Sequence, residues 1–165
     1  MIFRMYDKTL DLDLDEWGSS SYSTNSYVVN KYALFSEKPS EIYDWYISHV
    51  GEMSDIFDKI IVVMDGSIKI AFIVFNYFHD EDGEKVCGIN PILVNPKYIN
   101  QGFGKRIIKE IIERKCEMFD MKSDYIYAGI DNDNLICKRM FEKNGFVSYD
   151  KSDDEEFIYY KYIIK

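Results

Sequence analysis

The segment Val94–Ile107, with the sequence VNPKYINQGFGKRI, says most about the fold of this chain. It predicts a strand that ends at Pro96, a loop spaced by Gly102 and Gly104, and then the start of a basic helix. Glycine has no side chain, so the backbone can approach an anion closely and adopt conformations that other residues resist. The helix that follows begins with free N–H groups and a partial positive charge, which attract phosphate. The segment therefore predicts a site for a pyrophosphate.

Cationic residues gather at the start of this helix, although the chain as a whole is acidic. Lys105, Arg106 and Lys109 lie there, in a protein whose formal net charge is −9. The acidic balance argues against nucleic acid as the main partner, because phosphate contacts need a basic face. It favours a cationic small molecule or a basic peptide as substrate, through electrostatic steering.

Two other phosphate-binding motifs do not fit the glycine loop. Gly102 and Gly104 begin like a dinucleotide-binding fingerprint, but Ile107 stands where a third small residue is needed. That fingerprint also belongs to the first βα unit of its fold, whereas this loop lies past the midpoint of the chain. No G-K-[ST] follows the glycines, which excludes a Walker-type loop. A tight strand-to-helix turn without a ligand remains as the simpler alternative.

The whole chain has the length and composition of one globular domain. It has 165 residues, 47% of them hydrophobic and 16% aromatic. No apolar run is long enough for a membrane span, and the N-terminus lacks the apolar run of a signal peptide. Cys87, Cys116 and Cys137 lack metal or redox spacing, so we expect free thiols in a reducing compartment. These features predict a cytoplasmic protein with neither nucleic acid nor a membrane as partner.

The hydrophobic pattern predicts helices and strands of a mixed α/β sheet in one domain. Residues 10–15, LDLDLD, fit either a short strand or the edge of an acidic helix. Residues 157–164, FIYYKYII, fit either an exposed edge that pairs in a dimer or a covered core strand. The expected strands are 59–64, 68–78, 85–94, 124–130, 146–149 and 157–164, and the expected helices are 39–50, 105–119 and 134–143.

Two motifs resemble those of the GNAT superfamily of N-acetyltransferases. The family's pyrophosphate signature, V-x-P-x-x-R/Q-x-x-G-x-G/A, is matched from Val94 to Gly104, with Ile99 where arginine or glutamine is usual. Residues 134–146, NLICKRMFEKNGF, are similar to N-x-x-A-x-x-L-Y-E-K-x-G-F, with Phe141 where relatives often have a tyrosine. The clear resemblance covers residues 59 to 146.

The resemblance implies a single-domain α/β fold with a mixed, mostly antiparallel sheet flanked by helices. It also implies a V-shaped splay between the central strands, which holds cofactor and acceptor. Residues 59–165 would form the sheet and the acetyl-CoA-binding core, and residues 1–58 the acceptor-side helices and loops. Tyr22, Tyr27 and Trp45 are expected to line the acceptor pocket, with core packing as the alternative for each.

The resemblance also implies acetyl-CoA as co-substrate, without a metal. Backbone amides from Ile99 to Lys105 would hold the pyrophosphate, and the main chain of Ile92 to Val94 would pair with pantetheine. Asn134 would contact the pantetheine arm, with helix capping as an alternative or additional role. The implied cofactor-binding residues are Ile92, Leu93, Val94, Ile99, Asn100, Gln101, Gly102, Phe103, Gly104, Lys105, Asn134 and Phe141.

The implied chemistry is direct attack of a primary amine on the thioester carbonyl. The amine, with a reference pKa of about 10.4, must first lose a proton. The backbone N–H of Val94 would stabilise the oxyanion. Phe141 occupies the place of the usual tyrosine acid, so water, Tyr98 or Tyr149 would have to protonate the leaving thiolate. The strand 85–94 carries no carboxylate within it, so the general base is not identified, and the charges of residues 79–84 are expected to be solvated.

The sequence thus predicts an N-acetyltransferase that acts on a small-molecule or peptide amine, as a monomer or homodimer. The alternative from another class is a catalytically silent acyl-CoA-binding module that senses or regulates. Phe141, Ile99 and the missing base favour that alternative.

Overall fold

A computed structural model describes residues 1–17, 38–49, 57–114 and 123–164. Tyr22, Tyr27, Cys116 and the end of the helix expected over 105–119 lie outside these residues. The helices and strands are β1 (Ile2–Met5), α1 (Lys8–Asp11), η1 (Leu12–Glu16), α3 (Pro39–His49), β2 (Phe57–Asp65), β3 (Ile68–His79), β4 (Lys85–Val94), η2 (Pro96–Tyr98), α4 (Phe103–Glu113), β5 (Tyr125–Asp131), α6 (Leu135–Glu142), β6 (Val147–Lys151) and β7 (Phe157–Ile163).

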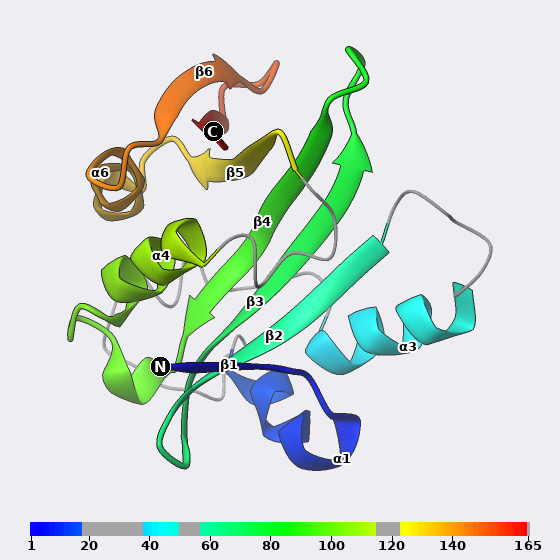
Figure 1. The fold of residues 1–165 in the computed structure, drawn as a ribbon. Coiled ribbons are helices and arrows are strands. Elements are labelled where there is room, and N and C mark those ends of the chain that lie inside the picture. The colour runs from blue at the N-terminus through cyan, green and yellow to red at the C-terminus, as the bar shows by residue number, and fades with distance from the viewer. Residues whose placement is uncertain (18–37, 50–56, 115–122, 165) are drawn as a thin grey trace.

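The seven strands form one sheet in the order β1-β2-β3-β4-β5-β7-β6 (Figure 1). Every neighbouring pair is antiparallel except β4 and β5, which run parallel. The sequence prediction of a mixed, mostly antiparallel sheet is therefore confirmed.

Helices cover both faces of this sheet, and each face has its own core. On one face α4 and α6 bury Ile107, Ile108, Ile111 and Phe141 against the strands. On the other face η1 and α3 lie over β2 and β3, where Trp17 packs against Phe72. Figure 1 shows α4 on one side of the strands and α3 with α1 on the other. The central strands are therefore packed on both faces, and the loops at their ends extend from this packed sheet.

The closing strands resolve one alternative left open by the sequence. β7 pairs with β5 on one side and with β6 on the other, and Tyr160 at its centre is only 2% exposed. The exposed-edge interpretation of residues 157–164 is thus wrong, and the core-strand interpretation is correct. β6 forms that edge of the sheet instead.

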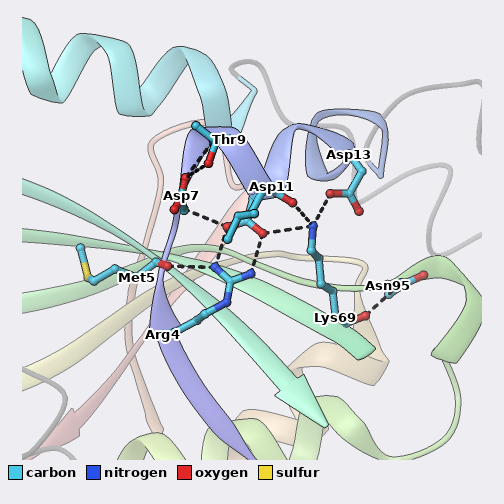
Figure 2. Close-up of polar contacts among 9 residues, drawn as sticks. Arg4, Met5, Asp7, Thr9, Asp11, Asp13, Lys69 and Asn95 are labelled. Atoms are coloured by element: carbon cyan, nitrogen blue, oxygen red, sulfur yellow. Dashed lines mark hydrogen bonds and ion pairs between the residues drawn. The ribbon is translucent and has the colours of Figure 1, made fainter. Parts of the chain in front are cut away.

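The N-terminal segment contains a strand that the sequence pattern did not reveal. β1 adds four residues to the sheet beside β2, and residues 10–15 are helical rather than extended. Asp11, the last residue of α1, is fully buried, and its carboxylate accepts two hydrogen bonds of 2.7 Å from Arg4. Lys69 of β3 lies 3.1 Å from the same carboxylate (Figure 2). These charges attach the N-terminus to the start of β3.

β4 and β5 are paired over only part of their length. Their parallel register runs from Val86 opposite Tyr125 to Ile89 opposite Ala128. Beyond that point, among the described strands, β4 continues to Val94 paired with β3 alone, while β5 continues to Asp131 paired with β7 alone. The expected V-shaped splay between central strands is therefore present, and Figure 1 shows the two ribbons diverging.

Candidate active site

The loop between β4 and α4 lies at the open end of this splay. Asn95 begins it, and η2 follows directly, with Pro96 buried at its first position. The backbone then takes left-handed conformations at Asn100, with φ of 62°, and at Gly102, with φ of 80°. The second of these residues caps α4. The loop therefore turns the chain sharply and directs the N-terminus of α4 towards the gap beside β4.

The two glycines of the motif, Gly102 and Gly104, are required for different structural reasons. Gly102 has nothing within 4 Å of where a Cβ would stand, so its positive φ is the reason for glycine there. A Cβ on Gly104 would lie 3.0 Å from Sδ of Met140 and 3.9 Å from Cγ2 of Val94. Gly104 thus lets the first turn of α4 pack closely against α6 and the end of β4.

The amides of this loop are available for a ligand. In the described part of the chain, the N–H groups from Asn100 to Lys105 have no hydrogen-bond acceptor, and the first helical bond is from the Arg106 amide to the Gly102 carbonyl, at 3.2 Å. Gly102 has no side chain with which to cap the helix. The side chain of Lys105 is exposed, and the Arg106 guanidinium lies 5.3 Å from the centre of the Phe103 ring. Open amides, a helix dipole and cations together favour a diphosphate.

The last residues of β4 expose main-chain groups to the splay. The Asn95 N–H donates to the carbonyl of Ile70 in β3, at 2.7 Å. N–H groups of successive strand residues point to opposite sides, so the Val94 N–H points away from β3, towards the gap. A bulge where Asn90 and Pro91 lie opposite Val74 shifts the register just before this stretch. Within the part of the chain that the structure describes, the end of β4 thus offers Ile92 and Val94 as an unpaired edge.

Asn134 has the position and the contacts of a helix cap. It precedes α6, is only 9% exposed, and its side-chain oxygen accepts the Cys137 N–H at 3.1 Å. The capping role considered from the sequence is therefore confirmed. Its amide nitrogen has no partner among the described residues, which leaves that donor for a ligand.

Phe141, the residue at the tyrosine position of the motif, lies in the core. It is 2% exposed, and its ring meets the Phe146 ring edge-on at 4.8 Å between centroids. Burial, with the Asp131 carboxylate adding to it, raises the pKa of the Cys137 thiol to about 12. Burial and the hydrogen bond to Glu142 raise the pKa of the nearby Tyr160 to about 12. These groups therefore stay protonated at neutral pH.

The other acids considered from the sequence lie apart from one another. Tyr98 is half-buried in η2 and packs edge-on against Phe103, with 6.4 Å between the ring centres. Tyr149 lies on β6, where the Lys161 ammonium is 4.9 Å from its ring centre. Burial, followed by the charge of Asp150, raises its pKa.

The charged turn over residues 79–84 lies at the wrong end of β4 to supply a base. His79 pairs with Lys85, the first residue of β4, whereas the loop follows Val94, the last. Asp80 accepts a hydrogen bond from the Tyr125 hydroxyl at 2.9 Å and three bonds from amides of its own turn. Although the little burial it has raises the pKa of Asp80, these hydrogen bonds outweigh it and hold that pKa below its ordinary value. The turn is a structural feature of the β3–β4 hairpin.

Ile99 and Trp45 also have defined surroundings. Ile99, which replaces the usual arginine or glutamine, packs against the core beneath η1 and α3. Trp45 is 46% exposed on α3 and stacks on His49, with 4.6 Å between ring centres. The packing of Ile99 against this core explains why the loop accommodates an apolar residue at position 99.

A family model described as the Acetyltransferase (GNAT) family matches residues 14–146 of this chain. The chain belongs to the GNAT family of acetyltransferases. It is accordingly an acyltransferase, and its family uses acetyl-CoA as co-substrate. No curated protein matches the chain in sequence.

Solved structures of other GNAT proteins have the same fold. A mutant of the spermidine N-acetyltransferase SpeG from Vibrio cholerae is 13% identical, with a TM-score of 0.69 over 98% of this chain and 92% of that one. A putative GNAT acetyltransferase from Desulfovibrio desulfuricans is 15% identical, with a TM-score of 0.64 over 98% of both chains. At such identities the likeness concerns the fold.

Two features of this GNAT site were not foreseen from its sequence. One is the contact of Met140 with Gly104, which joins residues of two helices. The other is the set of bonds made by Asn95, whose position before Pro96 was noted only as a strand exit. An asparagine before a proline is a turn signal, so the bonds of Asn95 could have been predicted from the sequence.

No described helix is long and apolar enough to cross a membrane.

Proposed function

We propose that this protein transfers the acetyl group of acetyl-CoA to a primary amine of a small molecule or peptide. The observation that carries the proposal is the pair of open main-chain surfaces: the amides of the loop before α4 and the unpaired edge of β4 beside it. A diphosphate on the first and an extended pantetheine along the second would be continuous, since the loop directly follows the strand.

Most of the predicted site residues have a part in this proposal, and Phe141, which is buried in the core, does not. The main chain from Ile99 to Lys105 holds the diphosphate, and Ile92 to Val94 pair with the pantetheine amides. The side-chain nitrogen of Asn134, which has no partner among the described residues, donates to the same arm. The Val94 N–H, which points away from β3, polarises the thioester carbonyl and stabilises the oxyanion that forms as the amine attacks.

The chain supplies no tyrosine at position 141, so the thiolate leaves by another route. A thiol has a reference pKa of about 8.5, which makes its anion a tolerable leaving group near neutral pH. Water in the splay is a sufficient proton donor for it. The general base is not assigned to a residue, and a water chain that accepts the ammonium proton serves the same step.

A cationic alkylamine is the acceptor class that charge favours. The net charge of −9 raises the local concentration of cations. The spermidine N-acetyltransferases among the structural relatives make polyamines a reasonable first panel. Residues 1–58 would provide the acceptor side.

The experiment incubates the protein with acetyl-CoA and a panel of polyamines, aminoglycosides, amino acids and peptides, and follows thiol release. Turnover with any amine supports the proposal. The alternative is the silent acyl-CoA-binding module, which the burial of Phe141 and the core contact of Ile99 favour. Calorimetric binding of CoA without turnover across the panel would favour that module, and no binding at all would overturn both.

A further inference from the structure

The end of β4 is held by one side chain that the proposed function does not use. Asn95 is the first residue after the strand, and four hydrogen bonds meet on it. Its main-chain N–H donates to the Ile70 carbonyl at 2.7 Å, and its side-chain nitrogen donates to the Lys69 carbonyl at 3.1 Å. In the other direction, its side-chain oxygen accepts the Lys97 N–H at 3.0 Å and its carbonyl accepts the Tyr98 N–H at 2.8 Å.

These bonds have two distinct targets. The donors of Asn95 attach the chain to β3, and its acceptors fold the next residues into η2. The loop of open amides begins directly after η2, so its starting point and its direction both depend on this residue. Asparagine suits the position because its side chain carries both a donor and an acceptor.

The carbonyl that Asn95 uses on β3 is itself fixed. Lys69 contributes that carbonyl, and its ammonium lies against the buried carboxylate of Asp11 and also contacts Asp13 (Figure 2). Asp11 in turn is held by Arg4. The start of β3 is therefore attached to the N-terminal helices by ion pairs, and Asn95 is joined to that attached part of the sheet.

We infer that Asn95 is a positioning residue that holds the diphosphate-binding loop in its ligand-ready geometry. A loop without this attachment must be ordered by the ligand, and the ordering cost lowers affinity. The side-chain effect concerns the diphosphate and not the thioester, because the main-chain bond from Asn95 to Ile70, which holds the end of β4, does not depend on the side chain. This inference rests on the proposed binding of acetyl-CoA.

Substitutions at position 95 separate the two sets of bonds. Asn95→Ala removes both side-chain bonds, and we expect KM for acetyl-CoA and Kd for CoA to rise about ten-fold, as for one or two lost hydrogen bonds. Asn95→Ser keeps an acceptor for the Lys97 amide but does not reach the Lys69 carbonyl, and we expect about a three-fold rise. In both variants kcat and KM for the amine stay within about two-fold of the wild-type values, since the inference involves no reacting group.

A truncated substrate distinguishes positioning from a general loss of structure. Acetyl-pantetheine carries the same thioester but lacks the diphosphate. When it replaces acetyl-CoA as the acetyl donor, its KM should therefore be the same for Asn95→Ala and for the wild type. Asn144→Ala serves as the matched control. The Asn144 side chain also donates to a backbone carbonyl, that of Met140, at 2.8 Å, but in the turn after α6. We expect its Kd for CoA to match that of the wild type.

The outcomes are distinguishable from failure of the proposed function. If wild-type protein does not bind CoA, the proposed function itself fails. If wild-type protein binds CoA and Asn95→Ala binds it equally well, the positioning role is refuted. The positioning role is also refuted if Asn95→Ala raises KM for acetyl-pantetheine as much as KM for acetyl-CoA, or if kcat falls by the same factor by which Kd for CoA rises.

Discussion

Sδ of Met140 lies 3.0 Å from the point where a Cβ on Gly104 would stand. The two residues belong to α6 and α4, the helices that follow the two arms of the splay. Their contact brings the first turn of α4 close to α6, and so places the two motifs of the sequence side by side.

We expect Gly104→Asp to remove measurable binding of acetyl-CoA. The new side chain meets Met140 and brings a negative charge to a helix N-terminus that should receive a diphosphate. Isothermal calorimetry measures the loss. Gly83→Asp is the control for the added charge, because Gly83 lies in the β3–β4 turn with nothing within 4 Å of its Cβ position, and its φ of 80° is one that aspartate adopts more readily than most residues. Normal affinity in Gly104→Asp would end the assignment of the loop to the cofactor.

The steric part of this effect is separable from the charge. We expect Gly104→Ala to weaken CoA binding several-fold, because Met140 must move to admit even one methyl group. Met140→Ala should restore part of that affinity in the double variant. A double-mutant cycle on Kd measures the coupling, and additive effects would show that the helices do not contact one another as described.

We expect Asp11→Ala to cost about 3 kcal/mol of stability, because it leaves Arg4 and Lys69 without their shared buried partner. Asp44→Ala removes an exposed pair with Lys8 and should cost less than about 1 kcal/mol. Urea unfolding at pH 7 gives both values. Equal losses in the two variants would contradict the buried role of Asp11.

The same carboxylate gives stability a dependence on pH. Burial alone would raise the pKa of Asp11, but hydrogen bonds from Arg4, from the Asp7 amide and from Lys69 outweigh it and hold that pKa below its ordinary value. A lowered pKa in the folded state stabilises the protein above the unfolded value of about 3.9, and this stabilisation is lost as pH falls through the folded value. We therefore expect unfolding free energy to fall below about pH 4 in wild-type protein, and to fall less in Asp11→Asn.

Substitution of Asn134 should separate its cap from its ligand contact. Asn134→Ala loses the oxygen that accepts the Cys137 amide, and we expect it to cost about 1 kcal/mol of stability. Asn134→Asp keeps that acceptor but lacks the amide donor, so stability should hold while KM for acetyl-CoA rises several-fold. An unchanged KM in Asn134→Asp would restrict the residue to capping.

We expect Phe141→Tyr to change turnover modestly at neutral pH and more at low pH, if residue 141 lies at the sulfur of the cofactor. The thiolate leaves without much help near neutrality, so an added hydroxyl has little to contribute there. Thermal unfolding is measured in parallel, because a hydroxyl buried beside Phe146 without a partner destabilises by about 1–3 kcal/mol. A pH–rate profile identical to that of the wild type would place position 141 away from the sulfur.

Much of the fold was predictable from sequence, because its elements after residue 58 follow clear periodicities. The strands of the β3–β4 hairpin and the cap at Asn134 lie where the pattern places them. The turn between β4 and α4 and the start of α4 were predictable for the same reason, since glycine spacing and a helix start are local signals.

The N-terminal part was not predictable in this way. β1 is only four residues long and gains its stability from pairing with β2, which no local pattern shows. Asp11 looks like one of several surface carboxylates until Arg4 and Lys69 are brought beside it. The partner of Gly104 lies on another helix, so the reason for that glycine also required the fold.

The early end of the β4–β5 pairing has a consequence for solvent access to the backbone. Amide protons of Val86 to Ile89 lie between two paired strands, whereas those of Ile92 and Val94 on the β5 side have no neighbouring strand in the described ranges. One strand should thus show two rates of deuterium uptake, slow in its first half and fast at alternate residues of its second half. A bound thioester that completes the ladder would make both halves slow.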